Sequence, residues 1–101
     1  MEIVKKNGAD GIVLELSGKL DTNTAPELEN AISNLLISEE VKNLELNMEK
    51  ITYLSSAGLR VLLSTQKKIN MLQGQLVITN ASKTLKEVFE ITGFMGILTI
   101  V

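Results

Sequence analysis

The segment that decides the fold is Ile51-Thr52-Tyr53-Leu54-Ser55-Ser56-Ala57-Gly58-Leu59-Arg60-Val61-Leu62-Leu63. An apolar, strand-like run ends at Leu54, and a helical pattern begins at Leu59. Two hydroxyl side chains, Ser55 and Ser56, lie at the junction. Backbone N–H groups at the start of a helix are unpaired, and the helix dipole favours negative charge there. This junction is therefore suited to hold a phosphate, either as a ligand or attached to the serine itself.

Strands and helices alternate along the rest of the chain. The hydrophobic pattern predicts strands at residues 1–6, 11–17, 41–48, 75–79 and 97–101, and helices at residues 24–37, 56–72 and 82–93. Turn residues between the first two strands favour a hairpin. The later alternation favours parallel strands joined by helical crossovers. We therefore expect a mixed α/β fold with a small mixed sheet.

Local signals mark the ends of the predicted helices. Thr24 and Glu27 have the spacing of a capping box, with Pro26 tolerated in the first turn. Gly74 is expected to end the second helix and Gly93 the third.

Composition and charge narrow the class of protein. The 101 residues predict a single domain, residues 1–101, of ordinary apolar content (45%). The net charge of −2, the lack of a basic block and the three aromatic residues argue against nucleic acid as a partner. No apolar run reaches the roughly 20 residues of a membrane span, and residues 1–6 lack the apolar core of a signal peptide. We expect a cytoplasmic protein.

The residue types also argue against an enzyme. The chain has no cysteine and no histidine, which removes thiol catalysis, the usual general base and most zinc and iron sites. Neither Ser55 nor Ser56 lies in a Gly-x-Ser-x-Gly or Ser-x-x-Lys motif, and no Walker-type phosphate loop occurs. We expect no catalytic residue, no metal site and no cofactor.

Two segments together resemble a known family, the STAS domains. They are Gly18-Lys19-Leu20-Asp21-Thr22-Asn23-Thr24-Ala25-Pro26-Glu27-Leu28 and Tyr53-Leu54-Ser55-Ser56-Ala57-Gly58-Leu59. The second segment is similar to the phosphorylation loop of that family and the helix after it. The resemblance extends over nearly the whole chain, and the nearest type is the single-domain anti-sigma factor antagonist. It implies a small mixed sheet with three or four helices packed mainly on one face.

The resemblance also implies a mechanism. Such an antagonist binds an anti-sigma factor that is also a serine kinase, and this binding frees a sigma factor. The kinase then phosphorylates one serine of the antagonist, and a PP2C-type phosphatase removes the phosphate. Carried over by position, the phosphorylated serine is Ser56, with Ser55 as the fallback. The free antagonist is expected to be a monomer.

The resemblance places the partner-binding surface on two loops. Its expected residues are Asp21, Thr22, Asn23, Thr24, Ser55, Ser56, Ala57, Gly58, Leu59 and Arg60. Two positions depart from the family pattern, since Ser55 and Asn47 stand where the family often has Asp.

Structural roles are open to several of these residues. Ser55 or Ser56 is a favoured N-cap for the second helix. Asp21 has the features of an Asx-turn residue. Gly58 is either a space-saving helix residue or a point of close approach. The alternative function is a STAS regulatory or accessory module that is not phosphorylated, for example a subunit of a lipid transporter.

Overall fold

One five-stranded sheet organises the computed structural model, which describes residues 1–38 and 41–101. The strands follow chain order across the sheet. The β1–β2 pair is antiparallel and the other neighbouring pairs are parallel, which confirms the predicted mixed sheet. The elements are β1 (Glu2–Asn7), β2 (Ile12–Leu20), α1 (Ala25–Ser38), β3 (Asn43–Leu54), α2 (Ser56–Met71), β4 (Gln75–Thr79), α3 (Lys83–Ile91), a 3-10 turn η1 (Phe94–Gly96) and β5 (Thr99–Ile100).

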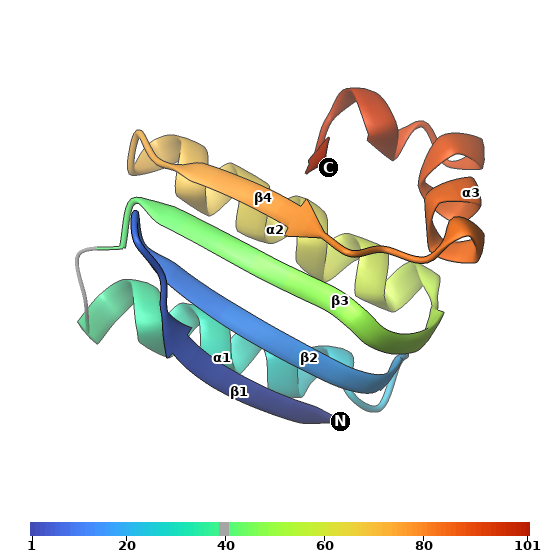
Figure 1. Cartoon of the computed structure of the whole chain (residues 1–101), viewed down its shortest axis with the longest axis horizontal. Helices are drawn as coiled ribbons and strands as arrows, with labels where there is room; N and C mark the ends of the chain where they lie inside the picture. Colours follow the sequence, from blue (N-terminus) through green and yellow to red (C-terminus); the bar gives the residue numbers. More distant parts are fainter. Residues whose placement is uncertain (39–40) are drawn as a thin grey trace.

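The hydrophobic core lies between one face of this sheet and helices α1 and α2. Figure 1 shows both helices behind the sheet, with α3 beyond the end at which the parallel strands finish. Alternate residues of β2, β3 and β4 point into the core, as a half-buried strand requires. The most completely buried large side chains are Phe89, Leu16, Leu20, Leu28, Ile32, Leu44, Leu46, Met48, Leu62, Ile69, Leu76 and Ile78.

The other face of the sheet is largely polar. On this face the Thr79 hydroxyl donates to the Glu45 carboxylate at 2.9 Å. Lys6 and Glu15 form an exposed ion pair with an N–O distance of 3.2 Å. Alternation of apolar and polar residues is typical of a sheet that is covered on one side.

Strand β3 runs six residues beyond the predicted end at Met48. Its pairing with β2 shifts twice: Glu15 faces Asn47 but Ser17 faces Lys50, and Gly18 faces Ile51 but Lys19 faces Tyr53. Each shift places one extra residue in β3, which is a β-bulge. The bulges break the alternation of buried and exposed residues after Met48, so the period-2 pattern on which the prediction rested stops there.

The end of α2 differs from the predicted glycine stop. Gln73, not Gly74, adopts the left-handed conformation, with a φ of 58°. The N–H of Gln73 donates to the Asn70 carbonyl and that of Gly74 to the Ile69 carbonyl, a Schellman pair of hydrogen bonds. Gly74 is needed for a different reason, since a Cβ there would lie 2.1 Å from the carbonyl oxygen of Lys42.

The start and end of α3 follow the prediction. The Ser82 hydroxyl caps the helix by accepting from the Leu85 N–H at 3.2 Å. Gly93 follows the helix with a φ of 79°. The predicted strand at 97–101 is shorter, because only Thr99 and Ile100 pair with β4.

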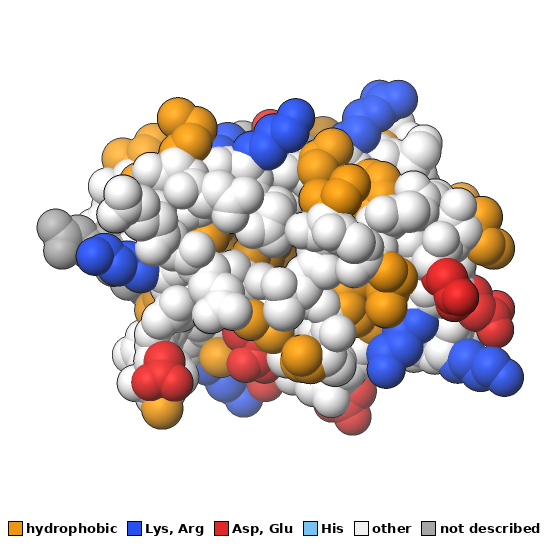
Figure 2. Space-filling model, turned by 90° about the horizontal axis from the view of Figure 1, so that it is seen from above, with side chains coloured by type: hydrophobic (Ala, Val, Ile, Leu, Met, Phe, Trp, Pro, Cys, Tyr) orange, Lys and Arg blue, Asp and Glu red, His pale blue; other side chains and the backbone are white. Residues whose placement is uncertain are grey.

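The surface above β4 has no single dominant apolar patch. Figure 2 shows its hydrophobic side chains in several groups, with Lys and Arg side chains at scattered places. Exposed large apolar residues occur at both ends of the chain and between them: Val4, Ile37, Tyr53, Met71, Leu72, Ile91, Met95, Ile97 and Val101. No helix in the described ranges has the length and apolar character needed to cross a bilayer.

Opposite effects are expected for glycine exchanges at the end of α2. Gln73→Gly should stabilise the fold by about 0.5–1 kcal/mol, because it removes the cost of a left-handed residue that bears a Cβ. Gly74→Ala should destabilise it by about 1–3 kcal/mol, because the new methyl group meets the Lys42 carbonyl. Urea denaturation of the two variants measures both changes, and a gain in stability for Gly74→Ala would contradict this account.

Candidate functional site

The two serines at the β3–α2 junction have different surroundings. Ser55 is the N-cap of α2, with extended backbone (φ −97°, ψ 173°), and its hydroxyl accepts a long hydrogen bond, 3.4 Å, from the Gly58 N–H. Ser56 is the first helical residue and is exposed. Within the described ranges, the Ser56 hydroxyl forms no hydrogen bond. The capping role therefore falls to Ser55, and the hydroxyl of Ser56 stays available.

Ser55 stands where the family that the sequence resembles often has Asp, and this changes the charge at the start of α2. Asp and Ser are about equally favoured as N-caps, so the serine keeps the cap. It does so without a charge, and the first turn of α2 has no acidic residue.

The ends of β2 and β3 bring the two predicted loops together. Leu20 and Leu54 are paired neighbours in these parallel strands. Ser55, the residue that follows β3, donates its N–H to the Leu20 carbonyl at 2.9 Å. Asp21 follows Leu20 directly, so the loop before α1 and the start of α2 lie at one edge of the sheet. We call this the strand-end edge.

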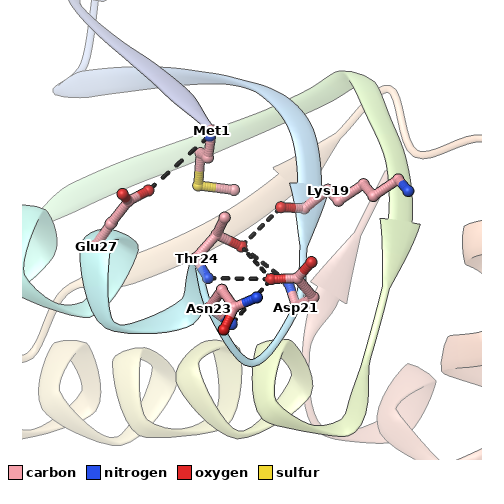
Figure 3. A network of polar contacts seen from close by, with 6 residues as sticks. All are labelled: Met1, Lys19, Asp21, Asn23, Thr24 and Glu27. Carbon is pink, nitrogen blue, oxygen red and sulfur yellow. Dashed lines mark hydrogen bonds and ion pairs between the residues drawn. The ribbon is translucent and has the colours of Figure 1, made fainter.

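A closed set of hydrogen bonds, the Asp21–Thr24 box, shapes the loop before α1 (Figure 3). The Asp21 carboxylate accepts from the N–H groups of Asn23 (2.9 Å) and Thr24 (3.1 Å). In return, the Thr24 hydroxyl accepts from the Asp21 N–H at 2.9 Å. It also lies 2.7 Å from the Lys19 carbonyl and 3.2 Å from the Asp21 carboxylate, and its single proton favours the shorter contact.

This geometry corrects the predicted capping box. The reciprocal pair is Asp21 with Thr24, one turn earlier than the predicted Thr24 with Glu27. The Thr24 hydroxyl bonds to Asp21 and Lys19, which precede it in the chain, so it does not cap α1. Glu27 instead lies 4.0 Å from the N-terminal ammonium group, with a side chain that is 58% exposed.

The box also sets the charge state of Asp21. The hydrogen bond from the Thr24 N–H is the largest influence, and it lowers the pKa of the Asp21 carboxyl below its ordinary value. The Asn23 N–H and the positive charge of Lys19 act in the same direction, while desolvation opposes them. Asp21 therefore carries a negative charge at the strand-end edge at neutral pH.

Gly58 is a site of close internal packing. It is buried, and a Cβ there would lie 2.7 Å from Leu20 Cγ and 2.8 Å from Leu54 Cδ1. The close approach is made by core side chains of this chain and not by an outside backbone. The glycine thus lets α2 begin directly against the ends of β2 and β3.

The predicted partner-binding residues fall into three groups by exposure. Thr22, Asn23, Ser56 and Arg60 are exposed; Asp21, Thr24, Ser55 and Ala57 are half-buried; Gly58 and Leu59 are buried. The last two therefore support the surface from below.

One surface residue was missed in the sequence. Tyr53, 52% exposed, lies opposite Lys19 in the β2–β3 pair, two residues before the helix cap. Tyrosine is a common anchor in protein interfaces. The signal was an aromatic side chain in the quoted junction segment, directly before the buried Leu54.

Asn47, the second departure from the family pattern, links β3 to β4. Its side-chain oxygen accepts from the Glu49 N–H (3.1 Å) and from the Asn80 amide (3.2 Å). Asn80 has a φ of 57°, a conformation that asparagine tolerates well. This contact has a structural role at the end of β4, seven residues before the end of β3.

Acid should reveal the contribution of Asp21 to stability. Because its folded-state pKa is lowered, the charged form contributes stability above the unfolded-state value of about 3.9, and that contribution is lost as the pH falls through the folded-state pKa. Asp21→Asn keeps a side-chain oxygen that can accept hydrogen bonds but cannot titrate. As the pH is lowered from about 6 to 2, the melting temperature of the parent should fall more steeply than that of this variant. Parallel curves would contradict the role of the box.

Adding a methyl group at Gly58 should destabilise the protein. Overpacking against Leu20 and Leu54 costs about 1–3 kcal/mol, and the higher helix propensity of alanine returns at most about 1 kcal/mol. A net loss of about 1–2 kcal/mol is expected for Gly58→Ala in denaturant titration. The matched control is Gly96→Ala, where a Cβ would meet nothing within 4 Å and the change should stay within about 0.5 kcal/mol. Equal stability of the two variants would show that the contact is easily relieved.

Comparison with known proteins finds relatives of similar sequence. The BtrV protein of Bordetella bronchiseptica is 34% identical over 92 residues, which cover 90% of this chain and 78% of BtrV. The anti-sigma-B factor antagonist of Listeria monocytogenes is 30% identical over 97 residues, 96% of this chain and 84% of the relative.

Solved structures show the same fold. The anti-sigma factor antagonist SpoIIAA in its unphosphorylated form matches with a TM-score of 0.76 at 19% identity, over 99% of this chain and 87% of SpoIIAA. The Bacillus SpoIIAA structure in the phosphorylated form matches with a TM-score of 0.75 at 20% identity, over 99% of this chain and 91% of SpoIIAA. The family model of the STAS domain matches residues 1–101 of this chain. This chain belongs to the STAS domain family.

Proposed function

We propose that this protein is an anti-sigma factor antagonist that is switched off by phosphorylation of Ser56. It binds an anti-sigma factor with serine-kinase activity, and this binding releases a sigma factor. The observation that carries the proposal is the division of roles at the start of α2, where Ser55 caps the helix and Ser56 presents a free, exposed hydroxyl. The names of the similar proteins support the same function.

The strand-end edge supplies the proposed partner surface. Thr22 and Asn23 present polar groups from one loop, and Ser56 and Arg60 from the start of α2. The hydrogen bond between Ser55 and Leu20 holds these two segments side by side. Tyr53 extends the surface along β3, and arginine and tyrosine are residue types that interfaces favour.

Charge explains how phosphorylation would end the binding. A phosphoserine adds about −1.5 to −2 charges at neutral pH. The lowered pKa of Asp21 means that the neighbouring loop is already negative. An added phosphate carries more charge than a single basic side chain neutralises, and removing its water against the partner is costly. The modified form therefore separates from the kinase.

Two further parts complete the proposed cycle. A PP2C-type phosphatase removes the phosphate from Ser56 and restores binding. The protein acts in the cytoplasm, as a monomer when free, without a cofactor or a metal of its own. Among residues 1–38 and 41–101, no three His, Cys, Asp or Glu side chains gather into a metal cluster.

Ser56 variants should separate the two states of the switch. Ser56→Ala removes the acceptor but keeps a neutral surface, so binding to the kinase should persist. Ser56→Asp adds a charge and should weaken binding by on the order of 1–3 kcal/mol where that charge stays unpaired. Calorimetric titration against a purified anti-sigma factor kinase from the same organism measures both affinities. Equal affinity of the parent, the Asp variant and the phosphorylated protein would refute the switch.

The site of modification is tested by mass spectrometry of peptides after incubation with kinase and ATP. Phosphate is expected on Ser56, and Ser55→Ala is the matched control, because it should lose some helix stability but keep the acceptor. Phosphate on Ser55 or Ser64 with none on Ser56 would overturn the assignment. No phosphate with any anti-sigma factor kinase of the organism would favour the alternative, a STAS accessory module that is not phosphorylated.

A further inference from the structure

Helix α2 has an unbalanced charge. Its sixteen residues include no Asp or Glu, while Arg60, Lys67 and Lys68 are basic. The Lys68 ammonium group donates to the Ser33 hydroxyl at 3.1 Å, so it is engaged with α1. A negative group in the first turn would suit both the helix dipole and the basic side chains, but the first turn has no acidic residue.

Arg60 lies one helical turn after Ser56, on the same face of α2. Side chains four residues apart have Cβ atoms about 5–6 Å from each other, and helical side chains lean toward the N-terminus. The helix spacing therefore places Arg60 within reach of a group attached to Ser56. Both residues are exposed, and in the described part of the chain the Arg60 guanidinium has no ion pair or hydrogen bond.

We propose that Arg60 holds the phosphate of phosphorylated Ser56 and is the positioning residue of the modified state. This inference rests on the proposed function, because it concerns the same serine. The guanidinium group offers a planar fork of N–H donors that matches two phosphate oxygens, and a charged pair of this kind is stronger than a neutral hydrogen bond. An Arg60 that is committed to the phosphate is also withdrawn from the partner surface.

Other charged groups at the strand-end edge do not replace Arg60. The Asp21 carboxylate repels a phosphate, and its own charge is already stabilised within the Asp21–Thr24 box. Lys19 is exposed on β2 and interacts electrostatically with Asp21. The basic residue that α2 places one turn from Ser56 is Arg60. The neutral Ser55 cap leaves no carboxylate in the first turn to compete for this guanidinium.

The test installs phosphoserine at position 56 during translation, so that no kinase is needed. A phosphorus NMR titration then measures the second pKa of the phosphate, ordinarily about 6. In the parent this pKa should lie below that of Arg60→Gln by on the order of 0.3 unit, because the guanidinium favours the doubly charged form. Arg60→Lys should fall between the two, since it keeps the charge but loses the fork.

Lys67→Gln is the matched control. It removes one positive charge from the same helix, eleven residues after Ser56, which is about 16 Å along the axis. This distance exceeds the screening length of about 8 Å at physiological salt, so the phosphate pKa should match the parent. Circular dichroism of all variants verifies that the exposed substitutions leave the fold intact.

Equal phosphate pKa values in the parent and Arg60→Gln would overturn the inference, as would an equal shift in Lys67→Gln. A kinase that fails to modify Ser56 would refute the proposed function but leave this titration unchanged. The two proposals can thus fail separately.

Discussion

The hydrogen bond from the Ser55 N–H to the Leu20 carbonyl fixes the geometry on which the candidate site depends. It joins the ends of two neighbouring parallel strands at the point where each chain leaves the sheet. Gly58 makes the join possible, because any side chain there would meet Leu20 and Leu54. Two loops that are more than thirty residues apart in sequence therefore form one edge, held by buried core residues.

At the strand-end edge, the residues that hold the fold differ from those that carry the proposed phosphorylation. The buried Gly58 and Leu59 and the capping Ser55 hold the start of α2, while Ser56 and Arg60 project from it. The Asp21–Thr24 box does the same for the neighbouring loop, since its carboxylate and hydroxyl are used internally. In the proposed switch, a phosphate on Ser56 adds charge without removing a hydrogen bond or a packed side chain that holds the fold.

The sequence predicted the order of elements, the mixed sheet and the position of the two serines, because hydrophobic period and turn residues encode them directly. It failed where two local options compete. Thr24 suits a helix cap, yet its hydroxyl bonds backward to Asp21 and Lys19. Gly74 suits a helix stop, yet the Lys42 carbonyl requires a glycine there and Gln73 takes the strained conformation. For Gly74 a contact from a distant segment decided between the options, and for Thr24 the loop before the helix did.

The same limit applies to the surface residues. The two bulges in β3 leave Lys50 and Thr52 on the surface and take Ile51 into the core, and bulges leave no period in the sequence. Bulges of this kind often lie beside functional sites, where they redirect a side chain. Here two bulges in succession restore the alternation, so that Leu54 is buried, Tyr53 is exposed and the Ser55 N–H bonds to Leu20. The irregularity that hides the length of β3 from sequence analysis thus lies directly before the residues that form the strand-end edge.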